Sequence, residues 1–578
     1  RREGTPTDFQ RFWDSKGINV FHADEDTSYS VKLLNDIEQK TLTFSSDNNY
    51  LAQTTNGYMY ITDDTDVYQS TNEGVTWTAM TSTSISYTIH GIAAFGNDLF
   101  VVAGDGGTNK QLLSYVQSTD TWTDESLGSS FTGYFTGIWF AKGGLFVSGK
   151  STTAEYLWES SPFTKNFSGD FQSTSALIVT EPTHEFTSVI DAGAVVLAGH
   201  TDGNIYSLKI DGGTWSLKGQ TQISFEEIHS LAASEGLVFI GTKGFQSNTG
   251  RFFTADLTVA DNLYVLTNRQ LVKQWDNGVD QSPHSMFVTR DSVYMGIHES
   301  ATETNLWRYY LPTAGIARDL SVTHSSDTNA KVTGITQTGT TGGKFIILIS
   351  GVGVYKQTDT FVSTGYIISA LADFYTSEKK QWVGAKLNTN GVSSGTIALA
   401  TTTIPNDINN SASITWTPQI SVASGTGGEE EVLELVQGRW MSAKLTITTS
   451  DTSQSPELLS FAVRGFQLVN DLVVDMPINI SDQVERPFRK ALRVNGQGDL
   501  IYQALRNKEG QNVQLEIFRP DTLLRGIIEN VSSPIEEISP RGSVTQYCLV
   551  RFRGSKVIAT SASGEGLAIG LLGVERLG

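Results

Sequence analysis

The feature that most constrains this chain is an internal repeat, which recurs from Thr41 to about Lys380 with a unit of about 40 to 50 residues. Each unit contains two apolar runs separated by a tight turn, as in HGIAAFGNDLFVVAGDGG, and then a polar strand that often ends near an aromatic residue. Such a pair of runs predicts two adjacent buried strands joined by a Gly or Asn turn. Because β-helix repeats are shorter and sandwiches rarely repeat in sequence, about seven such units predict a β-propeller, with about six or about eight blades left open.

The composition also indicates a protein built mainly of strands. Aromatic residues make up 10% of the 578 residues and charged residues only 18%, which is typical of many short strands joined by turns. The length is enough for roughly three or four domains. We therefore predict a mainly β protein, in which a β-propeller of about seven blades is followed by a β-sandwich and a small α+β C-terminal domain.

Charge and motif content narrow the possible partners. The formal net charge of −20 argues against nucleic-acid binding, because a phosphate backbone is bound by clustered Lys and Arg. No stretch approaches the roughly 18 apolar residues of a membrane helix, so we expect no membrane insertion. No P-loop, nucleotide fingerprint or His-Glu-x-x-His motif occurs, and we predict no cofactor.

Two further features concern the cysteine and the start of the chain. Cys548 is the single cysteine, so we expect a buried strand residue rather than an internal disulfide. The chain opens with Arg1 instead of Met, and no apolar signal region follows. This start is compatible with a longer gene product.

Residues 70–77, STNEGVTW, resemble the Asp-box of sialidase-like (BNR) propellers, whose pattern is Ser-x-Asp-x-Gly-x-Thr-Trp. Ser70, Gly74 and Trp77 match the pattern, and Asn72 replaces the Asp. Asn also accepts backbone hydrogen bonds in a turn, so the same hairpin can form. In that family the motif is a structural clasp remote from the catalytic centre, so the resemblance implies a blade fold and no activity.

The same resemblance implies a set of three arginines. Sialidases bind a carboxylate with three arginines from different blades, through bidentate hydrogen bonds. Between Arg11 and Arg251 this chain contains no arginine, so the first arginine of that family has no counterpart except Arg11. We predict that the propeller is not an enzyme, while hydrolysis by two carboxylates stays open because their pairing cannot be read from sequence.

Three other patterns have a functional and a structural interpretation. His90, His229 and His284 each precede the first apolar strand of a repeat and could converge on a metal ion, although repeat-derived packing is the simpler explanation. The acidic run in residues 63–66 could ligate calcium or form a solvated turn. Residues 391–395 match the letters of a Gly-x-Ser-x-Gly elbow, but no helix pattern follows, so we interpret the match as chance.

The chain divides into five predicted segments. Residues 1–40 should close the propeller or dock on it, and residues 41–380 form the propeller. Residues 381–468 alternate between apolar and polar and predict a β-sandwich, whereas residues 469–554 predict an α+β tail-assembly domain with one helix at about Gly498 to Lys508. Residues 555–578 are apolar and Gly-rich, which is typical of an arm that orders against a neighbour.

Two segments behind the propeller resemble proteins of tailed bacteriophages. The run from GRWM through AKLTITTSD to SPELLSFAVRG, which begins at Gly438, looks like the end of sandwich modules common in phage structural proteins. The DQ segment, short helix and EGQNVQLEI strand resemble C-terminal domains of phage minor tail proteins. The resemblance implies a virion protein of the tail or baseplate, with other tail or baseplate proteins as partners and a homo-oligomeric state, trimer or hexamer.

The charge distribution suggests where assembly and recognition take place. Residues 382–578 contain 17 basic and 20 acidic residues, so the rest of the chain carries −17 of the net charge of −20. Arginine is favoured at interfaces, although these side chains could also form ordinary surface salt bridges. The assembly candidates are Arg486, Arg489, Arg493, Arg519, Arg551 and Arg553.

The leading hypothesis is therefore a phage tail or baseplate protein in the virion, whose propeller recognises a host-surface glycan or a protein. The alternatives are a glycoside hydrolase or carbohydrate-binding protein on an Asp-box propeller, and a cellular propeller adaptor.

Overall fold

The structure is a computed structural model with two compact units. The first unit comprises Arg1–Tyr375, Trp382–Val436 and Trp440–Arg464, and the second comprises Thr376–Gln381, Gln437–Arg439 and Gly465–Gly578. Within these units the structure describes residues 12–20, 30–80, 85–125, 131–167, 171–172, 174–260, 262–339, 343–369, 371–372, 380–390, 392, 394–403, 414–423, 429–431, 436–438, 440–467, 472–480, 497–516, 523–538 and 544–557.

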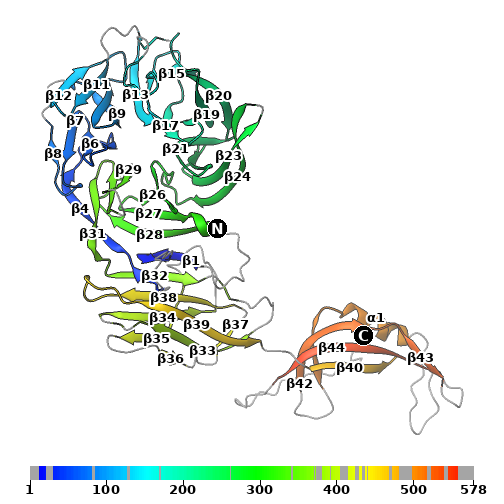
Figure 1. Ribbon diagram of the computed structural model, residues 1–578. Helices are drawn as coiled ribbons and strands as arrows, with labels where there is room; N and C mark the ends of the chain where they lie inside the picture. The colour runs from blue at the N-terminus through cyan, green and yellow to red at the C-terminus, as the bar shows by residue number, and fades with distance from the viewer. Residues whose placement is uncertain are drawn as a thin grey trace. The chain divides into compact units, whose positions relative to one another are not determined.

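Seven antiparallel four-stranded sheets in the first unit form the predicted β-propeller (Figure 1). Six blades follow the chain order. They are β5 (Leu51–Gln53), β6 (Met59–Asp63), β7 (Asp66–Ser70) and β8 (Thr78–Ala79); β9 (Thr88–Phe95), β10 (Asp98–Gly104), β11 (Lys110–Val116) and β12 (Thr121–Asp124); β13 (Tyr134–Ala141), β14 (Gly144–Lys150), β15 (Glu155–Glu159) and β16 (Ile178–Thr180); β17 (Phe186–Asp191), β18 (Val196–His200), β19 (Asn204–Asp211) and β20 (Thr214–Gln222); β21 (Glu226–Ser234), β22 (Leu237–Gly244), β23 (Gly250–Ala260) and β24 (Leu263–Trp275); and β25 (Met286–Val288), β26 (Ser292–Ser300), β27 (Glu303–Tyr310) and β28 (Gly315–Thr323).

The seventh blade closes the ring with a strand from the start of the chain. It contains β29 (Val332–Gln337), β30 (Phe345–Ile349) and β31 (Gly353–Phe361), and its outer strand is β4 (Asn35–Thr43). In this pairing Tyr355 lies opposite Gln39, and Gln357 lies opposite Ile37. The expected segment boundary between residues 40 and 41 therefore falls inside β4, because the closing strand is paired with the last blade.

The apolar runs of the repeat form the propeller core. The central strands β6, β18 and β30 are buried along their whole length, as the runs predicted. Neighbouring blades share their side chains: Phe146 of the third blade and Val189 and Trp215 of the fourth belong to one buried cluster. Burial of such rings contributes most of the stability of a fold made of short strands.

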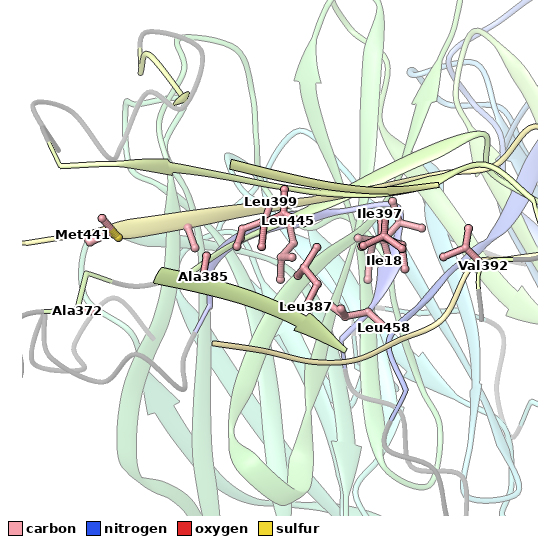
Figure 2. Close-up of a cluster of buried hydrophobic side chains, with 14 of the residues drawn as sticks. Ile18, Ala372, Ala385, Leu387, Val392, Ile397, Leu399, Met441, Leu445 and Leu458 are labelled. Carbon is pink, nitrogen blue, oxygen red and sulfur yellow. The ribbon is translucent and has the colours of Figure 1, made fainter. Parts of the chain in front are cut away.

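A two-sheet region completes the first unit. One sheet has the order β1 (Phe12–Lys16), β32 (Thr364–Ser369), β38 (Ser442–Thr448), β34 (Thr396–Thr402) and β35 (Thr417–Ala423). The other contains β36 (Glu429–Glu431), β33 (Lys380–Thr389), β37 (Val436–Gly438) and β39 (Leu458–Gln467), and a short pair joins β2 (Ile18–Asn19) to β3 (Lys32–Leu33). Figure 2 shows Leu399 and Leu445 meeting Ala385 and Leu387 between the sheets.

This region is larger than the predicted segment 381–468. β32 pairs with β1 and β38, so the propeller ends at Phe361 and the residues after it already belong to the two-sheet region. β1 lies against β28 of the sixth blade, where the N–H of Gly17 donates to the carbonyl of Asp319 at 2.6 Å. The propeller and this region are therefore joined by hydrogen bonds as well as by chain connections.

The second unit combines one helix with a five-stranded antiparallel sheet. The sheet contains β40 (Leu472–Asn479), β44 (Val544–Val557), β42 (Leu523–Val531), β41 (Asn512–Glu516) and β43 (Ile535–Ile538), and the helix is α1 (Gln497–Asn507), close to its predicted position. Leu505 of α1 packs with Ile528, Val550 and Cys548, which is buried in β44 as expected. Residues of the predicted arm after Val557 lie outside the described residues. In the described ranges, no helix has the length and apolar character needed to cross a membrane.

Candidate functional site

The end of β7 and the turn after it hold the four residues of the Asp-box-like motif. The buried hydroxyl of Ser70 accepts a hydrogen bond from the N–H of Gly74 at 2.8 Å and donates to Oδ1 of Asn72 at 3.0 Å. The same Oδ1 accepts from the N–H of Thr76 at 3.0 Å, and Nδ2 of Asn72 donates to the Thr76 hydroxyl at 2.8 Å. Asn72 thus accepts the backbone hydrogen bond of the turn and adds a donor that a carboxylate lacks.

This turn also connects two blades. Gly74 has φ +75°, and a Cβ there would lie 2.6 Å from Cδ1 of Ile346 on β30. Trp77 packs on the cluster formed by Met59, Ile346 and Leu348, so its indole belongs to the core between the first and seventh blades. The geometry gives the motif a structural role.

The structure brings two of the three candidate histidines together. The rings of His229 and His284 are 4.5 Å apart between centroids, whereas His90 lies on β9, where its Nε2 is 3.3 Å from the carbonyl of Gly104. Burial lowers the pKa of His284 to about 3, with the nearby His229 acting in the same direction. Among the described residues, no group of three or more His, Cys, Asp or Glu side chains is arranged to hold a metal ion.

The acidic run in residues 63–66 forms the β6–β7 turn, and its first carboxylate accepts several hydrogen bonds from the loop before β5. Asp63 is buried and accepts hydrogen bonds from the N–H and hydroxyl groups of Ser45 and Ser46, at 2.9 to 3.1 Å. The side-chain amide of Asn49 donates to it as well, at 3.3 Å. These donors hold the loop before β5 on the blade. Of the Gly-x-Ser-x-Gly letters, residues 391 and 393 lie outside the described residues.

Two of the six candidate arginines are described, and both lie on β44. Arg551 forms a bidentate pair with Asp475, at 2.9 and 3.0 Å, and Nε of Arg553 lies 2.8 Å from Oε1 of Glu529. These side chains occupy the opposite sheet face from α1, and all four charges are locally compensated. Outside the described residues lie Arg486, Arg489, Arg493 and Arg519.

A polar pocket of about 580 Å³ opens among loops of the fifth, sixth, seventh and first blades. The strands within each blade are antiparallel. The turn between the second and third strands therefore lies at the same end of the propeller as the connection from the fourth strand to the next blade. These two loop classes supply the lining, which sequence reasoning did not find. Its charged side chains are Asp47, Lys243, Asp280 and Lys331, and its amide side chains are Asn48, Asn248 and Asn329.

Local contacts fix one wall of the polar pocket. Nζ of Lys243 lies 3.2 Å from Oδ2 of Asp280. Burial alone would raise the pKa of Asp280, but the interactions with His284 and the hydrogen bonds from Ser282 outweigh it and hold that pKa well below its usual value. Asp280 therefore remains a carboxylate at neutral pH.

Two exposed phenylalanines, called the aromatic pair, lie in loops at the same end of the propeller as the pocket, although neither is a lining residue. Phe225, in the link from β20 to β21, is 85% exposed with φ +63°. Phe245, 51% exposed, lies between the pocket residues Lys243 and Asn248, and its N–H donates to the carbonyl of Phe225 at 2.9 Å. A left-handed conformation is unfavourable for a bulky side chain, and Phe163 of the third blade also adopts it.

Comparisons with known proteins give the fold context. Neither the family models nor the curated proteins yield a match to this sequence. Solved structures with similarity include a chain of the mitotic checkpoint complex and YCF48 bound to a D1 peptide, each with 12% identity, a TM-score of 0.38, and coverage of 58% of this chain and 96% of that chain. The β-propeller domain of Cps50 (Swd1) from Myceliophteria thermophila has 13% identity and a TM-score of 0.38, covering 56% of this chain and 99% of that one. The propeller assignment rests on the seven sheets themselves.

Proposed function

We propose that this chain is a structural virion protein of a phage tail or baseplate, and that its propeller recognises a host-surface glycan or protein without covalent chemistry. The observation that carries the recognition role is the polar pocket with the adjacent aromatic pair, since ligand sites are concave and combine a few polar groups with apolar rings. The assignment to a phage tail is supported by the resemblance of the segments after Gly438 to phage structural modules.

The surroundings of the buried carboxylates support a binding role. A glycoside hydrolase needs two carboxyl groups on either side of the scissile bond, one of them with a raised pKa. Asp63 is saturated with hydrogen-bond donors, Glu226 pairs with Arg251, and Asp280 is held ionised. The described carboxyl groups whose pKa is raised by burial are Glu155, Glu159 and Asp319. Glu155 bonds to His200, Asp319 pairs with Arg308, and none of the three lines the polar pocket.

One observation favours the alternative of a glycoside hydrolase: Asp47 and Asp280 line the same pocket. With Asp280 ionised, Asp47 would have to be the general acid. Release of reducing ends from host polysaccharide by the purified chain, abolished in Asp47→Asn, would establish the hydrolase. We expect no turnover.

The second unit is the part we assign to assembly. α1 covers one sheet face, while the other exposes Val473, Ile527 and Leu549 between the ion pairs of Arg551 and Arg553. Val473 and Ile527 both lie opposite Arg553 in the sheet, and an apolar patch rimmed by polar groups marks an interaction surface.

The test is composition and stoichiometry of the particle. We expect mass spectrometry of purified virions to find the chain, antibody labelling to place it at the tail, and native mass spectrometry to give a trimer or hexamer. The purified chain should also bind intact host cells. Virions that lack the chain would contradict the proposal.

A further inference from the structure

The polar pocket is large enough for a small ligand and has free hydrogen-bonding groups. Its volume of about 580 Å³ lies within the usual range of ligand pockets, about 300 to 1,000 Å³. Within the described part of the chain, the side chains of Asn48, Asn329 and Lys331 have no hydrogen-bond partner, and the hydrogen bonds of these residues are made by their backbone groups. These side chains therefore present two amides and an ammonium group to a ligand.

The charges of the pocket favour a neutral ligand. Two carboxylates, Asp47 and Asp280, are matched by two ammonium groups, Lys243 and Lys331, so the lining has no net charge. The chain as a whole carries −20, and such a field disfavours polyanions. A neutral molecule rich in hydroxyl groups fits best, because each hydroxyl donates one hydrogen bond and accepts others.

The aromatic pair supplies the apolar half of such a site. The ring of Phe225 is almost fully exposed although its backbone is strained, and Phe245 belongs to the loop that lines the pocket through Lys243 and Asn248. A pyranose ring has one flat face of C–H groups that packs on an aromatic ring, while its hydroxyls point sideways to polar groups. A protein partner would instead need a contact of about 800 Å² on each side, far wider than this pocket.

We infer that the polar pocket and the aromatic pair form one binding site for a neutral saccharide. One sugar ring packs on Phe225 or Phe245, and its hydroxyls bond to Asn48, Asn329 and Lys331. The inference rests on the proposed recognition function and names its site and its ligand class.

The first experiment screens the purified full chain on an array of neutral and acidic oligosaccharides, followed by titration calorimetry with the best neutral one. We expect binding to neutral hexose or N-acetylhexosamine oligosaccharides. Binding only to acidic oligosaccharides, binding only to peptides in a parallel peptide array, or binding to neither would overturn the inference.

Variants then locate the site. Phe225→Gly removes the ring and relieves the left-handed strain, so folding should not suffer. Phe163→Gly is the matched control: Phe163 is 72% exposed with φ +62° and lies between β15 and β16, in a turn at the other end of the propeller from the pocket. We expect Phe225→Gly and the double variant Asn48→Ala with Asn329→Ala each to weaken binding at least about tenfold, whereas Phe163→Gly leaves it unchanged.

Two outcomes separate this inference from the proposed function. Equal affinity in Phe225→Gly, the double variant and the unchanged chain would overturn the assigned site, while host-cell binding would still support recognition by the propeller. Absence of the chain from virions would contradict the phage assignment and leave the measured saccharide affinity, and hence the inference, in place.

Discussion

Gly74 and Gly57 allow the contact between the first and seventh blades to be tested at the scale of single residues. Gly74 combines φ +75° with a Cβ position 2.6 Å from Cδ1 of Ile346, whereas Gly57 has φ +86° and no atom within 4 Å of that position. Gly57→Ala should cost about 1–2 kcal/mol of unfolding free energy from conformation alone. Gly74→Ala should cost about 1–3 kcal/mol more, because it adds an overpacked contact.

Urea unfolding of the two variants measures this difference. In a double-mutant cycle, Ile346→Val removes the Cδ1 atom and should recover part of the extra cost in Gly74→Ala. Equal costs for the two alanine variants would show that the Asp-box-like turn does not hold a close approach of these blades.

At the scale of elements, a buried ionic network joins the third and fourth blades. Nε2 of His200 on β18 lies 3.3 Å from Oε2 of Glu155 on β15, and Nδ1 lies 2.8 Å from Oδ1 of Asp202. Burial alone lowers the pKa of His200, but the hydrogen bonds and charges of Asp202 and Glu155 outweigh it, and its pKa is raised. Burial likewise raises the pKa of Glu155, which its hydrogen bonds with His200 and Phe186 only partly offset.

These directions set a pH dependence of stability. A His with a raised folded pKa stabilises fully below its unfolded pKa of about 6.5, and this contribution is lost as pH rises through the folded value. The raised pKa of Glu155 acts in the same direction, because its contribution to stability is lost as the pH rises above its usual pKa of 4.5. We expect the free energy of unfolding to fall as the pH rises above about 6.5, and His200→Gln to flatten that slope.

His90 provides the matched control for this prediction. Burial lowers its pKa, so its titration lies below about 6.5 and His90→Gln should leave the slope above that pH unchanged. Denaturant unfolding across the pH series measures all three proteins. An unchanged slope in His200→Gln would show that the interface between these blades does not depend on the histidine.

Individual strands show how much of the fold could be predicted from the sequence. The buried strands β9 and β10 follow from the apolar runs around Gly96 and Asn97, because burial and tight turns leave local signals. No local signal shows that β32 belongs to the two-sheet region, because alternation of apolar and polar residues indicates a strand but not its partner. The polar pocket was missed for a related reason: its lining comes from loops of four blades, each an ordinary polar turn in sequence.

At the scale of the whole molecule, the net charge of −20 makes salt a test of what the propeller recognises. The Debye length falls from about 10 Å at 0.1 M salt to about 3 Å at 1 M, so contacts that depend on the field of the protein weaken across this range. A neutral saccharide has no charge for that field to act on, and hydrogen bonds to Asn48 and Asn329 at short range are not screened. We therefore expect the Kd of the best neutral oligosaccharide, measured by calorimetry, to change by less than about twofold between these salt concentrations. A rise of about tenfold or more would show that recognition depends on charged groups of the ligand, which a balanced pocket of two Asp and two Lys residues does not explain.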